Sequence, residues 1–250
     1  MNKENILEVN GVRKIFKKIV GTGTFLSLIS SLRYNKENIV ALNDVSFSLK
    51  KGENLGIIGK NGSGKSTLLR ILANIYKKDK GVIRRNGSLT YISGFTYGLK
   101  RQMSVIDNIY ILGYFLGLTR KEISKRVFKI IDFAELGNHT HTPIYQLSRG
   151  MMNKLGFSIY IHCISSNKPD IILIDEAIST GVDYKFQKKI IIKMRELLNS
   201  DSSVILVSHN LHIIKKYCDR VLWIEKGSVV KIGTPSDTVY DYLDYLKIDF

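Results

Sequence analysis

The chain has 250 residues, of which 44% are hydrophobic and 24% charged, and its formal net charge at pH 7 is +16. This length and composition predict a globular protein with one hydrophobic core and room for a small subdomain. No apolar run approaches the ~20 residues that a membrane-spanning helix needs. The longest, residues 109–118, has half that length and two glycines. No secretory signal is expected at the start of the chain.

The positive charge does not by itself indicate a nucleic-acid partner. Lysines are scattered in pairs such as Lys17-Lys18 and Lys215-Lys216, and no dense basic arm with interleaved aromatic residues occurs. No nucleic-acid partner is therefore expected, and the charge also agrees with phosphorylated ligands or an anionic membrane face. Cys163 and Cys218 have neither metal-ligand nor redox spacing, so they are expected to be reduced thiols of a cytosolic protein.

The N-terminal part predicts a pair of strands. Residues 5–16 and 44–49 alternate apolar and polar side chains, as in an antiparallel pair. Residues 17–39 lie between them as an insertion that contains two glycines and an apolar run at 25–29.

The next segment fits a phosphate-binding pattern. Residues 59–66 match G-x-x-x-x-G-K-[S/T], between an apolar strand over 55–58 and a helical pattern over 67–72. Glycines let successive N–H groups turn toward a phosphate, and the helix N-terminus adds partial positive charge. Lys65 is expected to contact the β- and γ-phosphates, and the Ser66 hydroxyl to ligate Mg²⁺. The expected nucleotide-binding residues are Gly59, Lys60, Asn61, Gly62, Ser63, Gly64, Lys65, Ser66 and Thr67.

The middle of the chain is helical. Ser104 is placed to cap one helix, residues 119–122 form a capping box for a second, and a third is expected to start near Ser148. The block from about 95 to 165 therefore predicts a helical subdomain.

Strands and helices alternate around this block. Strands are predicted over 89–92, 171–174 and 204–207, helices over 186–198 and 211–217, then a hairpin over 221–232 and a helix from about Ser236. This alternation around a phosphate loop implies a mainly parallel sheet flanked by helices. The expected fold is a single α/β domain over residues 1–250, with a P-loop NTPase core, N-terminal antiparallel strands and the inserted helical subdomain.

Two of the predicted strands end in chemically active residues. Asp175 and Glu176 follow the strand over 171–174, and ligands bind at the carboxyl ends of parallel strands. Asp175 is placed to hold Mg²⁺, usually through water, and Glu176 to polarise the attacking water. His209 follows the strand over 204–207. Alone, such a histidine is more often an ordinary strand-end residue, but beside these groups it is expected to contact the γ-phosphate or the attacking water.

Residues 145–151, Tyr-Gln-Leu-Ser-Arg-Gly-Met, complete the pattern. With the phosphate loop, the acid pair and Ser208-His209-Asn210, in this order, they resemble the ATP-binding subunits of ABC transporters, over roughly residues 5–235. The resemblance implies a head-to-tail homodimer, in which Ser148 and Gly150 of one copy bind the γ-phosphate held by the other. Phe16 matches the aromatic that stacks on adenine in many relatives, and a hydrophobic strand-end residue explains it nearly as well.

Within the family, residues 147–157, 175–181 and 186–189 resemble exporters of capsule, O-antigen or wall teichoic acid. This implies an ATPase that uses ATP and Mg²⁺, bound peripherally at the cytoplasmic face of the membrane to a separate transmembrane permease. The insertion over 17–39 is similar in position to one seen in several members. It could form a short interfacial element or a loop against the sheet. Another cargo, a non-transport ABC protein, or a subunit that binds ATP without cleaving it are the alternatives.

The chain departs from the family pattern at three places. Arg149 replaces the first glycine of LSGGQ, and no coupling-loop glutamine is evident near residues 94–96, since Gln102 lies too far along. Asp183 falls one residue later than the usual interface aspartate, with Val182 as the apparent insertion. These differences bear on turnover and coupling more than on ATP binding.

Overall fold

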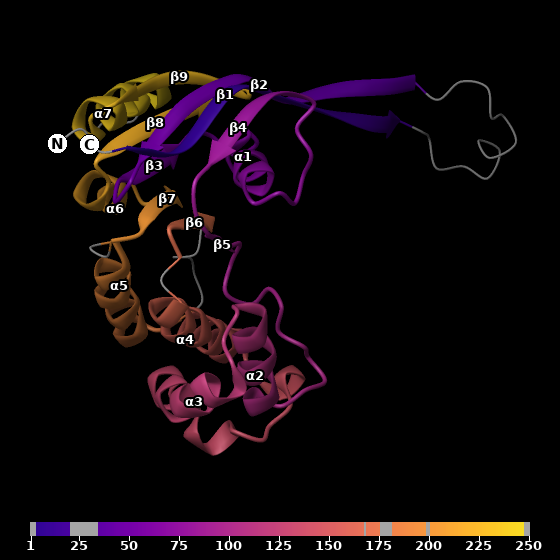
Figure 1. Cartoon of the computed structure of the whole chain (residues 1–250), viewed down its shortest axis with the longest axis vertical. Coiled ribbons are helices and arrows are strands. Elements are labelled where there is room, and N and C mark those ends of the chain that lie inside the picture. Colours follow the sequence, from indigo (N-terminus) through magenta and orange to yellow (C-terminus); the bar gives the residue numbers. More distant parts are fainter. Residues whose placement is uncertain (1–3, 21–34, 168, 176–181, 199–200, 248–250) are drawn as a thin grey trace, which may run out of the picture.

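The computed structural model describes residues 4–20, 35–167, 169–175, 182–198 and 201–247. Figure 1 shows an elongated molecule, with two sheets at one end, a group of helices at the other and an arm that projects from the sheet end. Among the described residues, no helix is both long and apolar enough to cross a lipid bilayer.

The arm is built from the two longest strands. β1 (Asn5–Val20) and β2 (Asn35–Lys50) pair antiparallel along their whole length, from Asn5 opposite Lys50 to Val20 opposite Asn35. β4 (Lys80–Arg85) pairs with β1 only as far as Arg13. The remaining parts of β1 and β2 therefore leave the three-stranded sheet β2-β1-β4 as a two-stranded ribbon (Figure 1). Both strands extend beyond the predicted ranges, into the predicted insertion.

The second sheet has six strands in the order β5-β6-β7-β3-β8-β9. Its strands are β3 (Asn54–Ile58), β5 (Leu89–Ile92), β6 (Ile171–Asp175), β7 (Ser203–Val207), β8 (Arg220–Glu225) and β9 (Ser228–Gly233). The first five run parallel, and β9 closes an antiparallel hairpin with β8. The flanking helices are α1 (Lys65–Leu72), α5 (Tyr184–Leu198), α6 (Leu211–Tyr217) and α7 (Pro235–Leu246). The expected α/β fold with a mainly parallel sheet is confirmed.

The six-stranded sheet separates two hydrophobic cores. β3, β6 and β7 are buried over their whole length, as expected for parallel strands covered on both faces. Alternate residues of β6 enter different cores. Ile172 and Ile174 pack with α5, α6 and α7, whereas Ile171 and Leu173 pack with α1 and the antiparallel sheet.

The far end of the molecule holds α2 (Val105–Phe115), α3 (Arg120–Ala134) and α4 (Arg149–Asn167) around a third core. The predicted helix starts are confirmed. Ser104 and Thr119 each accept a hydrogen bond from the N3 backbone N–H in a capping box, at 3.2 and 3.4 Å. Helix α4 contributes to two cores, because Leu155 packs with α2 and α3 and Phe157 packs beneath the sheet.

Candidate nucleotide site

The loop between β3 and α1 has a shape that only glycine allows at two positions. Gly59 has φ 150°, and a Cβ there would lie 2.0 Å from the Ile224 carbonyl oxygen. Gly64 has φ 109°, and a Cβ there would lie 2.6 Å from the Ala41 carbonyl oxygen. The loop is therefore held against β8 and β2, and it turns directly into the N-terminus of α1.

Lys65 lies buried at this turn. Its ammonium donates to the carbonyl oxygens of Gly59 and Lys60, at 2.7 and 2.9 Å, so the cation lies against the loop. The Ser63 hydroxyl is also buried, and it finds no hydrogen-bond partner among the described residues. A hydroxyl without a partner and a cation inside one glycine loop suit an anion with several oxygens, such as a phosphate chain.

Two oxygen donors meet beside the loop. The Ser66 hydroxyl donates to Asp175 Oδ1 at 3.1 Å, which brings α1 and the carboxyl end of β6 together. Among the described residues, no three His, Cys, Asp or Glu side chains form a metal cluster. The Ser66–Asp175 pair nevertheless fits Mg²⁺, which is typically held by one or two protein oxygens together with substrate phosphates.

Sequence reasoning missed the other partner of this carboxylate. The Tyr91 hydroxyl donates to Asp175 Oδ2 at 3.1 Å. Burial, then the charge of Asp175, raises the pKa of Tyr91 to about 12, so the phenol keeps its proton at neutral pH. Arg70 of α1 donates to the Tyr76 hydroxyl at 3.3 Å. The signal available in the sequence was the tyrosine in the predicted strand over 89–92. Its contact with Asp175 follows only from the register of β5 and β6, in which Tyr91 lies opposite Leu173.

Phe16 lies half-buried on β1, where the ribbon begins. Its ring meets the edge of Tyr76, with centroids 5.6 Å apart, and the Lys14 ammonium lies 5.3 Å from its centroid. Asp79 pairs with Lys14 at 3.1 Å and accepts from the Ile15 N–H at 2.6 Å. This part of β1 is therefore tied to the segment after α1, and adenine stacking on Phe16 remains a prediction.

Ser148 and Gly150 lie at the start of α4. Ser148 is exposed, and its hydroxyl accepts from the Met151 N–H at 3.2 Å, as an N-cap does. The neighbouring Leu147 belongs to the helical core, whereas the phosphate loop lies at the sheet end (Figure 1). The exposed helix start offers a hydroxyl and backbone N–H groups to a ligand outside the chain.

The remaining predicted residues lie around the sheet edge. His209 is exposed after the carboxyl end of β7, and Asn210 caps α6 by accepting from His212 N–H at 3.1 Å. Asn61 and Gly62 are exposed at the loop tip, and Thr67 is half-buried in α1. Glu176 lies outside the described residues.

Asp183 has a structural partner on helix α4. Its carboxylate accepts from the Phe186 N–H at 2.9 Å, which caps α5, and pairs with Lys154 of α4 at 2.5 Å. The Lys154 hydrogen bond, followed by the Phe186 N–H, lowers the pKa of Asp183 to about 2. Lys154 also pairs with Glu135 at 2.6 Å.

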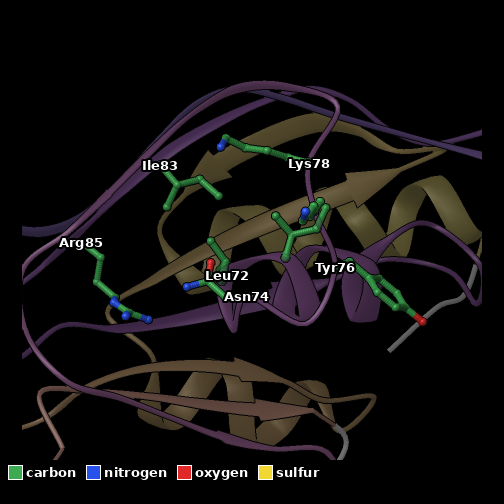
Figure 2. A pocket seen from close by; sticks show the side chains of 8 residues that line it. Leu72, Asn74, Tyr76, Lys78, Ile83 and Arg85 are labelled. Atoms are coloured by element: carbon green, nitrogen blue, oxygen red, sulfur yellow. The ribbon is translucent and has the colours of Figure 1, made fainter.

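A surface pocket of about 610 Å³ lies between the end of α1 and β4. Figure 2 shows side chains that line this pocket, among them Leu72, Asn74, Tyr76, Lys78, Ile83 and Arg85. No residue from 59 to 67 lines this pocket, so it is separate from the predicted nucleotide site.

Comparison with known proteins gives the family. The ABC transporter family model matches residues 42–179. The teichoic acids export ATP-binding protein TagH of Bacillus anthracis is 38% identical over 207 residues, which make up 83% of this chain and 37% of that protein. The O-antigen export system ATP-binding protein RfbB of Klebsiella pneumoniae is 40% identical over 195 residues, 78% of this chain and 77% of that protein.

The chain belongs to the ABC transporter family. It spans little more than a third of the length of the Bacillus TagH protein. A dimeric ATP-binding cassette, solved in a post-hydrolysis state with ADP and Pi, has the same fold. Its TM-score is 0.70 at 22% identity, with 92% of this chain and 98% of that chain covered. In ABC terms, residues 59–66 fit the phosphate-loop pattern, Asp175 follows the buried strand pattern over 171–174, and residues 147–151 resemble the LSGGQ segment.

Proposed function

We propose that this chain is the ATP-binding and ATP-hydrolysing subunit of an ABC exporter that moves a lipid-linked cell-surface polysaccharide. The names of the TagH and RfbB relatives support the cargo class. We further propose that the subunit acts as a homodimer at the cytoplasmic face of the membrane, bound to a separate permease. Within the single domain, the helices over about 95–165 form its helical subdomain, and residues 17–39 are an insertion.

One observation carries this proposal. Lys65 and Ser66 follow the glycine loop directly, and Ser66 donates to the strand-end acid Asp175 at 3.1 Å. In this arrangement the loop and Lys65 bind the triphosphate, and Ser66 and Asp175 hold Mg²⁺, which offsets the negative charge of the phosphates. Glu176 acts as the general base for the attacking water, and His209 contacts the γ-phosphate.

The exposed start of α4 supports a shared site. A helix N-terminus with a hydroxyl cap attracts phosphate. The start of α4 lies at the helical end of the molecule, whereas the phosphate loop of the same chain lies between β3 and α1 at the sheet end. A second copy, turned head to tail, brings its phosphate loop to Ser148 and Gly150. ATP then joins the two copies, and hydrolysis loosens them.

Mixed dimers test the shared site. Two differently tagged copies, one Lys65→Ala and the other Ser148→Arg, are purified together with the permease, and steady-state ATP hydrolysis is measured. The head-to-tail dimer keeps one intact site, so activity survives in the mixture although either homodimer is inactive. The matched control places both substitutions on one copy and none on the other, and this pairing damages both sites.

The reverse pattern, activity only when both substitutions share a copy, would show that each site lies within one chain. Glu176→Gln is expected to abolish hydrolysis and keep ATP binding. Full hydrolysis by this variant would remove Glu176 from its role. Co-purification with ribosomes instead of a permease would favour a non-transport ABC protein.

A further inference from the structure

Three side chains from three elements meet beside the phosphate loop. Ser66 of α1 and Tyr91 of β5 both donate to Asp175 at the end of β6, each at 3.1 Å. A carboxylate accepts hydrogen bonds and a phenol carries one proton, so the single proton of the Tyr91 hydroxyl is directed at Asp175.

The two oxygens of Asp175 are held by different groups. Oδ1 accepts from Ser66 and Oδ2 accepts from Tyr91, both at 3.1 Å. Ser66 is itself assigned to the metal, and a hydroxyl whose oxygen ligates an ion is drawn toward that ion. The Tyr91 hydrogen bond needs no such change, because Tyr91 is not a ligand. The Tyr91 hydrogen bond can therefore keep the plane of the Asp175 carboxylate in place both with and without the metal ion. Asp175 is only 8% exposed, so this hydrogen bond lies in a setting of low dielectric constant, where it is strong.

We propose that Tyr91 is a positioning residue for the metal-binding carboxylate of Asp175. The inference rests on the proposed function, since it takes Ser66 and Asp175 as the pair that holds Mg²⁺. Groups that hydrogen-bond a metal ligand fix its orientation, and their removal costs roughly 10–100-fold in metal affinity or activity.

Tyr76 provides a matched control, because it is a second tyrosine whose hydroxyl is hydrogen-bonded to α1. Its hydroxyl accepts from Arg70 Nη1 at 3.3 Å, and the guanidinium lies 5.7 Å from its ring centroid. Among the described residues, Asp175 accepts from Ser66 and Tyr91 and not from Tyr76. Tyr76→Phe and Tyr91→Phe each remove one phenol hydroxyl, but only Tyr91→Phe removes a donor to Asp175.

The test is a binding titration with the purified full-length chain. A fluorescent ATP analogue is titrated in EDTA and again in Mg²⁺, and the ratio of the two affinities gives the gain that Mg²⁺ confers. For Tyr91→Phe, we expect this gain to fall about tenfold or more, while the affinity in EDTA stays as in the parent chain. Tyr76→Phe is expected to leave the gain unchanged. Thermal unfolding of each variant confirms that the chain is folded.

Asp175→Asn separates the two ways in which the idea can fail. If Asp175→Asn abolishes the Mg²⁺ gain and Tyr91→Phe leaves it unchanged, the positioning role is wrong and the metal assignment stands. If neither substitution changes the gain, Asp175 does not hold the metal and the assignment itself fails. Equal losses in Tyr76→Phe and Tyr91→Phe would show that the loss does not depend on the hydrogen bond to Asp175, and would also overturn the proposal.

Discussion

Gly156→Ala probes the closest contact between α4 and the segment that joins the sheet to the helical end. A Cβ at Gly156 would lie 1.7 Å from the Phe95 carbonyl oxygen and 2.5 Å from its carbonyl carbon. Non-bonded carbon atoms sit about 3.5–4.0 Å apart, so the two segments must separate by more than an ångström. Phe95 resists this movement, because its ring packs edge-on against Phe157 with centroids 4.8 Å apart.

The magnitude follows from two opposing effects. Alanine favours a helix over glycine by about 1 kcal/mol, whereas overpacking of a well-filled site costs about 1–3 kcal/mol. The clash at Gly156 is with backbone rather than with a flexible side-chain end, so the upper part of that range applies. We expect a net loss of about 2 kcal/mol in the free energy of unfolding, which lowers Tm by about 4–8 °C in a chain of this size.

Calorimetry of the purified chain measures this loss, with Gly137→Ala as the control. Gly137 begins the short helix η2 (Gly137–His139), and a Cβ there would meet nothing within 4 Å. The Tm of Gly137→Ala is expected to change by less than about 2 °C, since an exposed substitution usually changes the free energy of unfolding by no more than about 0.5 kcal/mol. If Gly156→Ala melts at the same temperature as Gly137→Ala, or higher, the contact between α4 and Phe95 is not as tight as described and the reasoning fails.

Three further substitutions test other parts of the structure. Asn108 is fully buried, accepts from Lys100 N–H at 2.6 Å and donates to backbone carbonyls, so Asn108→Ala is expected to destabilise by about 3 kcal/mol in urea unfolding. Lys154→Met should raise the pKa of Asp183 from about 2, and NMR titration measures this change. In the parent chain the depressed pKa of Asp183 stabilises the fold above pH ~4, and this stabilisation is lost as the pH falls toward 2. Lys65→Met removes the cation at the phosphate loop and should weaken ATP-analogue binding at least about tenfold, as measured by fluorescence.

Features governed by neighbouring residues could be predicted from the sequence. The caps at Ser104 and Thr119 are confirmed because a capping box is closed within four residues. The strand before the phosphate loop and the strand before Asp175 are confirmed for the same reason, since a short buried parallel strand is a continuous apolar run.

Features governed by distant partners escaped prediction. Only Ile83 among the six residues of β4 is even half-buried, so β4 has no clear buried face. It forms a strand because it pairs with the free edge of β1. The ribbon parts of β1 and β2, over residues 14–20 and 35–41, group their apolar and polar side chains instead of alternating them. In both cases the pairing partner, rather than the local pattern, determines the structure.

The metal-binding pair illustrates the same limit within the site. The phosphate-loop motif predicts Ser66, and a strand ending in two acids predicts Asp175, because each signal lies in one short segment. The contact of Tyr91 with Asp175 needs three facts together: that β5 is next to β6, that Tyr91 lies opposite Leu173, and that residues two apart share a face. Sequence patterns can therefore name the groups that bind a ligand, whereas the groups that orient them emerge only with the strand register.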